Sequence, residues 1–94
     1  MGYAEELAKL EAQLRGQEVD DFLAFLRLKN LKLRTQVEYL AVLRLLRQRL
    51  QDRAKPFAAV TSDELRDFVG WSQAQGLAPQ TVGNRAMILK RFFG

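Results

Sequence analysis

Three polar side chains near the starts of two expected helices have the chemistry to read the edges of nucleic-acid bases. Arg34 opens one helix-like segment, and Gln80 and Asn84 lie in the first turns of another. Arginine pairs with guanine edges, and asparagine or glutamine with adenine edges, when a helix presents them in a major groove. The pattern therefore favours contact with a duplex, although polar residues at a helix start are also typical of an ordinary solvated end.

Residues beside these three could complete such a surface. The hydroxyls of Thr35 and Thr81, with the free amides of the helix starts, can bind phosphate oxygens. Glu38 is unfavourable beside phosphates, but its carboxylate could accept a hydrogen bond from a cytosine amino group. Gly83 has no side chain, so it serves either close approach to another surface or close helix packing. Three further cations are candidate phosphate contacts: Arg44, Lys90 and Arg91.

The composition argues against catalysis. The chain has 94 residues with no cysteine and no histidine, which removes thiol chemistry, the commonest metal ligand and the commonest general base. No Gly-rich phosphate loop or calcium-loop spacing is present. We expect no enzyme activity, no metal and no cofactor in these residues. No apolar run approaches the roughly 20 residues of a membrane span, and the absence of cysteine fits a cytoplasmic protein.

The net charge of +4 is unevenly distributed along the chain. Residues 1–26 carry net −4, residues 27–55 net +7, residues 56–78 net −2 and residues 79–94 net +3. Such blocks can be plain solubility charge, or they can form a basic face turned toward a polyanion. The basic blocks contain the two helices that carry the polar residues above, so the second interpretation is favoured.

Hydrophobic spacing and boundary signals predict one all-α domain. Gly16 ends the first helix, Pro56 follows the third, Thr61 and Glu64 form a capping box before the fourth, and Pro79 opens the last. The expected helices cover 3–15, 19–29, 34–53, 62–75 and the residues from 79 onward.

A helical wheel separates inner from outer faces. The outward sides of the two basic helices carry Arg34, Val37, Glu38, Ala41, Arg44 and Gln48 on one, and Gln80, Gly83, Asn84, Met87 and Arg91 on the other. Phe25 and Trp71 are expected on inner faces, whereas Arg47, Arg49 and Arg53 are expected to be solvated charges.

Two stretches 46 residues apart share a pattern. Residues 31–35 (LKLRT) are followed by Tyr39, and residues 77–81 (LAPQT) are followed by Arg85. An apolar helix precedes each stretch and a basic helix follows it, so the chain is expected to form two helical hairpins.

The second stretch and its surroundings resemble a known family. Residues 76–85 (GLAPQTVGNR) and 89–93 (LKRFF) are similar to the pattern G-L-S-P-x-T-I-x-x-R followed by L-x-x-F-F. That pattern closes the N-terminal core-binding domain of tyrosine recombinases, the family of phage integrases and Xer-type proteins. Residues 31–39 resemble the family's earlier L-S-x-x-T-x-x-x-Y. The resemblance covers about residues 19–94.

The resemblance implies a four-helix SAM-like domain over residues 17–94 that forms half of a clamp on double-stranded DNA. Residues 1–16 would be an extra helix, either a cover for the bundle or an arm that docks on another molecule. By motif position, the implied major-groove contacts are Thr35, Val37, Glu38 and Ala41 on one helix, and Gln80, Thr81 and Asn84 on the other. The catalytic residues would belong to a C-terminal domain that this chain lacks, and that domain would be a partner in the full-length protein.

The chain departs from the family pattern at two helix caps. The family's capping serine is replaced by Lys32 and by Ala78, and each loss typically costs about 1 kcal/mol of helix stability. Two other functions stay open, a helical protein–protein interaction module and a stand-alone DNA-binding regulator. The isolated domain is expected to be a monomer that can form homo-oligomers on DNA.

Overall fold

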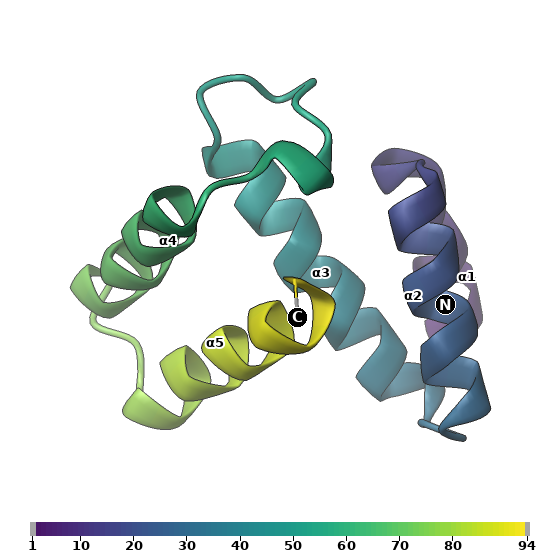
Figure 1. The fold of residues 1–94 in the computed structure, drawn as a ribbon. Coiled ribbons are helices and arrows are strands. Elements are labelled where there is room, and N and C mark those ends of the chain that lie inside the picture. The colour runs from purple at the N-terminus through teal and green to yellow at the C-terminus, as the bar shows by residue number, and fades with distance from the viewer. Residues whose placement is uncertain (1, 94) are drawn as a thin grey trace. The chain divides into compact units, whose positions relative to one another are not determined.

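The computed structural model describes residues 2–93, and every regular element in that range is helical (Figure 1). The elements are α1 (Tyr3–Leu14), α2 (Gln17–Leu28), α3 (Leu33–Arg49), a short 3-10 turn η1 (Phe57–Ala59), α4 (Ser62–Ala74) and α5 (Pro79–Phe93). This confirms the all-α class. Within residues 2–93, no helix is long and apolar enough to cross a membrane.

Helix α3 ends four residues earlier than the sequence predicts. A carboxylate oxygen of Asp52 accepts a hydrogen bond from the backbone amide of Ala54 at 3.0 Å, and the amide of Lys55 bonds to the carbonyl of Asp52. Aspartate side chains that bond to a nearby amide offer the backbone an alternative to the helix. The segment before Pro56 is therefore a turn, whereas the prediction extended α3 to residue 53.

The chain divides into two compact units, one extending to Leu45 and one beginning at Leu46, and each is described by itself. In the first unit, α1 packs against α2 (Figure 1). A salt bridge of 3.0 Å joins the Glu11 carboxylate to Arg27, and the rings of Phe22 and Tyr39 stack at 5.9 Å. Helix α1 therefore covers the first unit. The core positions of α1 and α2 are Leu7, Leu10, Leu14, Val19, Phe22, Leu23 and Leu26.

One predicted core position of this unit is wrong. Phe25 is 44 % exposed, and Leu23 takes the inner position instead. The ammonium of Lys29 lies 5.5 Å from the centre of the Phe25 ring. An aromatic ring under a cation can stay at the surface at little cost, which the apolar spacing alone does not indicate.

The second unit is built around Phe57, which is 1 % exposed. Its ring meets the rings of Phe92 and Phe93 edge-on, at 5.3 and 6.2 Å. The guanidinium of Arg47 lies 4.2 Å from the Phe57 ring centre, and that of Arg49 lies 4.5 Å from the half-buried Trp71. Arg47 is half-buried, so the prediction of a solvated charge is wrong for this residue, whereas Arg49 is exposed as predicted and also stacks on the Trp71 ring.

Helix α4 begins at the predicted capping box. The Thr61 hydroxyl accepts a hydrogen bond from the Glu64 amide at 3.2 Å, and the Glu64 carboxylate accepts one from the Thr61 amide at 2.9 Å. The ammonium of Lys55 donates to the same carboxylate at 2.7 Å. The Lys55 bond, followed by the Thr61 amide, holds the pKa of Glu64 below its ordinary value of 4.5.

The two repeat-related turns are alike in structure. Asn30 and Gly76, 46 positions apart, both have left-handed backbones, with φ of 55° and 74°. In each turn the amide of this residue bonds to the carbonyl three residues earlier, which closes the preceding helix. Each turn is followed by a half-buried leucine, Leu31 or Leu77. The hairpin repeat predicted from the sequence is therefore present in both units.

Candidate nucleic-acid interface

Helix α5 presents an open polar and basic face. Pro79 occupies its first position, where a missing amide costs nothing, and Val82, Ile88 and Leu89 are buried. The exposed residues of the helix after Pro79 are Gln80, Thr81, Gly83, Asn84, Met87, Lys90 and Arg91. Helix α5 contains no acidic residue, so its outer face is purely polar, apolar or cationic. The predicted outward positions of α5 are confirmed.

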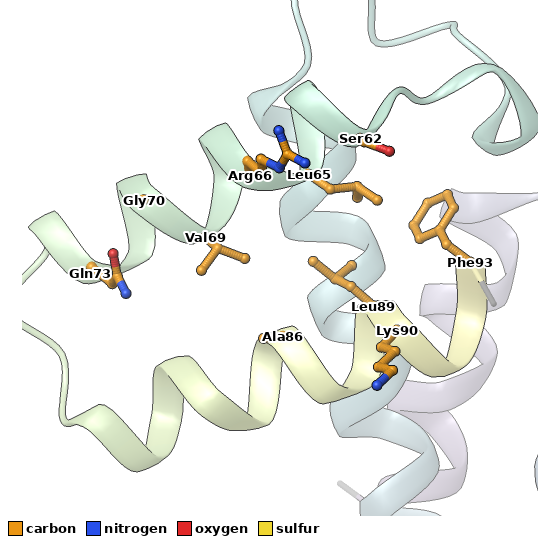
Figure 2. A pocket seen from close by; sticks show the side chains of 10 residues that line it. All are labelled: Ser62, Leu65, Arg66, Val69, Gly70, Gln73, Ala86, Leu89, Lys90 and Phe93. Carbon is orange, nitrogen blue, oxygen red and sulfur yellow. The ribbon is translucent and has the colours of Figure 1, made fainter.

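The opposite side of α5 borders an open groove shared with α4 (Figure 2). The groove has a volume of about 510 Å³ and is lined chiefly by apolar side chains, including Leu65, Val69 and Phe93. Leu89 points toward α4, whereas Lys90 points away from it (Figure 2). Lys90 therefore lies at the rim of the groove, and its exposed side chain extends away from α4.

Arg85 of α5 has a structural role that was not predicted from the sequence. A guanidinium nitrogen of Arg85 donates a hydrogen bond of 3.0 Å to the hydroxyl of Ser72, which is fully buried in α4. Arg85 therefore ties the two helices of the hairpin together and is removed from the candidate interface. The available signal was Ser72 itself, a small polar residue four positions after the buried Phe68.

Gly83 lies in open space. A Cβ atom added there would meet nothing within 4 Å, and the same holds for Gly70 in α4. The packing explanation for Gly83 is therefore wrong. Gly83 also lines an open hollow with Val69 and Gln73 of α4, and close approach to an outside surface stays a prediction.

The outer face of α3 carries charges of both signs, unlike the outer face of α5. Arg34 and Glu38 are both exposed and form a salt bridge of 3.4 Å across one helical turn. Thr35 is half-buried. The guanidinium that was expected to meet a guanine edge thus has an acidic neighbour on its own helix.

Beyond this first turn, α1 flanks α3. A groove of about 650 Å³ is lined on the α1 side by residues that include Glu5 and Glu6, and on the α3 side by Ala41 and Arg44. The side-chain oxygen of Gln13 accepts a hydrogen bond of 3.3 Å from Arg44. Ala41 and Arg44 therefore face α1 as well as solvent.

One predicted contact of α3 is wrong. Val37 lies one turn before Ala41 on the same side of α3, and it is only 7 % exposed. The wheel placed Val37 outward because it considers only the spacing within α3 and not the neighbours that the helix packs against. Val37 is a core residue of the first unit and has no side-chain surface to offer DNA.

The first turns of α3 and α5 differ in charge from the first turns of α1, α2 and α4. Acidic residues occupy the first turns of α1, α2 and α4, but no acidic residue occupies the first turn of α3 or α5. A helix N-terminus carries a partial positive charge that acidic side chains offset. The amides of α3 and α5 therefore keep an undiminished attraction for anions such as phosphate.

Comparison with known protein families identifies the chain at the level of a domain family. Residues 19–94 match the family model described as phage integrase, N-terminal SAM-like domain. No curated protein and no solved structure was found to match the chain. The match covers both hairpins and confirms the resemblance carried by residues 31–39 and 76–93; it begins after α1. The chain therefore belongs to the family of phage integrase N-terminal SAM-like domains, whose role is in site-specific recombination.

Proposed function

We propose that this chain is the DNA-binding half-clamp of a site-specific tyrosine recombinase and that it contacts the major groove of the core recombination site. The observation that supports this most directly is the outer face of α5. Its polar and cationic side chains are exposed, acidic residues are absent from the helix, and Gly83 leaves its middle open to a close partner. These are the properties that a helix needs to enter a groove between phosphate backbones.

In this proposal, the residues of α5 have two different roles in DNA binding. Gln80 and Asn84 read base edges, whereas Thr81, Lys90 and Arg91 contact phosphates. On α3, Arg34, Thr35 and Glu38 form a second contact region, and Ala41 and Arg44 lie at its margin beside α1.

The remaining parts of the proposal concern the protein beyond this domain. The family model describes an N-terminal domain, so we infer that a separate C-terminal domain of the full-length protein performs strand cleavage. That domain and further protomers on the same DNA would be the partners, and the cytoplasm would be the location.

Titration of a labelled duplex at two salt concentrations tests the proposal. The isolated domain should bind non-specific duplex with a Kd of about 10⁻⁴–10⁻⁶ M, and binding should weaken steeply as salt rises. A preferred sequence is then selected from a random duplex pool. Gln80→Ala with Asn84→Ala should reduce preference for that sequence, whereas Lys90→Ala or Arg91→Ala should weaken all duplexes alike. Absent or salt-insensitive binding would contradict the proposal.

A second candidate function is supported by a separate observation. Phe25, Leu28 and Leu33 leave 44 %, 83 % and 46 % of their surfaces exposed near the turn between α2 and α3. Exposed apolar side chains near one another in the chain favour a protein–protein contact. This interaction module would self-associate without DNA, and sedimentation of the free domain at rising concentration separates it from a monomeric DNA binder.

A further inference from the structure

Helix α1 lies beside the part of α3 that the motif resemblance assigns to DNA. Arg44 of α3 donates its hydrogen bond to Gln13 of α1, and Ala41 and Arg44 line the same groove as Glu5 and Glu6. The family match begins at residue 19, so α1 is an addition to the part of the chain that the family model describes.

The position of α1 is set by packing rather than by this polar contact. Leu7, Leu10 and Leu14 are 4 %, 2 % and 1 % exposed, and the salt bridge between Glu11 and Arg27 joins α1 to α2. The apolar side of α1 is thus already occupied within the first unit. The flank that faces Ala41 and Arg44 is held there as a consequence.

That flank is acidic. Glu5 and Glu6 are exposed, and Lys9 is the cation of α1 that lines the groove with them. A phosphate backbone that approached Arg44 would also approach these two carboxylates. Like charges brought together at an interface oppose binding, and the effect is strongest at low salt.

We propose that α1 is a built-in electrostatic brake on DNA binding by α3. Its carboxylates repel phosphate from the Ala41–Arg44 side of the helix, and Gln13 holds the Arg44 guanidinium in a bond within the protein. This proposal rests on the proposed DNA-binding function. It assigns to α1 a role that the motifs of the domain do not contain, which is to limit how much of α3 a duplex can reach.

Variants that replace carboxylates with uncharged amides of nearly equal size test the brake. Glu5→Gln with Glu6→Gln raises the net charge by two, from +4 to +6, and leaves the apolar face of α1 unchanged. Asp20→Asn with Asp21→Asn in α2 is the matched control, because it raises the net charge equally from the same unit. With non-specific duplex at about 50 mM salt, the α1 variant should bind about tenfold more tightly than wild type, and the control less than about threefold. Far-UV circular dichroism and thermal melting verify that both variants stay folded.

Substitution of Arg44 gives a second measurement, whose result does not depend on the net charge of the domain. If the brake withholds Arg44 from phosphate, Arg44→Ala should cost more affinity in the α1 variant than in wild type. The slope of log K against log salt should also steepen by about 0.9 in the α1 variant, as expected for one more phosphate contact. Lys90→Ala, on α5, should cost the same in both backgrounds.

The possible outcomes distinguish the brake by α1 from the proposed DNA-binding function. Equal gains from the α1 variant and the α2 control, or no gain from the α1 variant, would overturn the brake while wild-type binding still supports the DNA function. Failure of wild type and of every variant to bind duplex would overturn both. Binding by the α1 variant alone would support both, with a brake stronger than expected.

Discussion

Helices α3 and α5 follow the same turn at a distance of 46 residues, yet their outer faces differ. On α5 the predicted outward residues are exposed from Gln80 to Arg91, and the helix carries no acid. On α3, Arg34 is paired with Glu38, and the side that follows is flanked by α1. The shared motif thus fixes where each helix begins and which turn precedes it. It does not decide which side of the helix stays accessible, because that depends on elements outside the repeat.

Removal of the buried ring that packs against Phe92 and Phe93 of α5 should have the largest effect on stability. Phe57→Ala deletes a fully buried ring that contacts Phe92 and Phe93, and it should cost about 3–5 kcal/mol in the free energy of unfolding of the second unit. Urea unfolding followed through Trp71, the single tryptophan, measures this unit directly. Met87→Ala, at an exposed apolar side chain of α5 in the same unit, is the control and should cost much less. A loss below about 1.5 kcal/mol for Phe57→Ala would contradict the central packing role of its ring.

Substitutions on the two outer faces should then differ in their effect on DNA recognition. Asn84→Ala should reduce discrimination between a selected and a scrambled duplex by about 1–3 kcal/mol, as for loss of a base contact. Arg34→Ala should reduce it less, because Glu38 already holds that guanidinium at 3.4 Å. Competition binding measures both. Gln73→Ala, an exposed polar residue of α4, serves as a control, and an equal loss from Arg34→Ala would refute the contrast between the helices.

Gly83 and Gly70 allow a finer test of the α5 face. Both lie inside helices with open space around the missing Cβ, so alanine at either position should stabilise the fold by up to about 1 kcal/mol. Only Gly83→Ala should weaken DNA binding, since only Gly83 lies on the proposed contact face. Thermal melting and duplex titration of the two variants are compared. If both variants bind DNA as wild type does, no duplex approaches Gly83 closely.

The smallest expected effect is the pH dependence of the second unit. Bonding to Lys55 and to the Thr61 amide lowers the pKa of Glu64 in the folded state, so the unfolded chain binds this proton more readily. The stabilisation is therefore present above the ordinary value of 4.5 and is lost as the pH falls below it. Glu64→Gln should flatten the decline in unfolding free energy between about pH 5 and pH 3, measured by urea titration. An unchanged decline would show that other carboxylates cause it.

Much of the architecture could be predicted because local signals determined it. Apolar spacing and boundary residues identified the five helices, and the Thr61–Glu64 capping box is present as expected. The outer face of α5 was also predictable. A helix that is covered along one continuous side keeps the other side open, which is the assumption of a wheel.

The errors arose where a long-range neighbour decided the outcome. Arg44 is bonded to Gln13 of α1, and neither the repeat nor the family pattern includes α1. Val37 is buried although its spacing within α3 predicts an outward position. Arg47 is half-buried on Phe57, which lies 10 residues further along the chain. Spacing within a single helix carries no information about such partners.

On α5, the residues that hold the helix and the residues proposed to touch DNA are different sets. Val82, Leu89 and the bond from Arg85 to Ser72 anchor one side, while Gln80 and Asn84 stand on the other. Mutations at the outer positions can therefore accumulate with little penalty to folding. A recombinase with this hairpin could evolve, or be engineered, toward new target sequences through substitutions at a few exposed positions of α5.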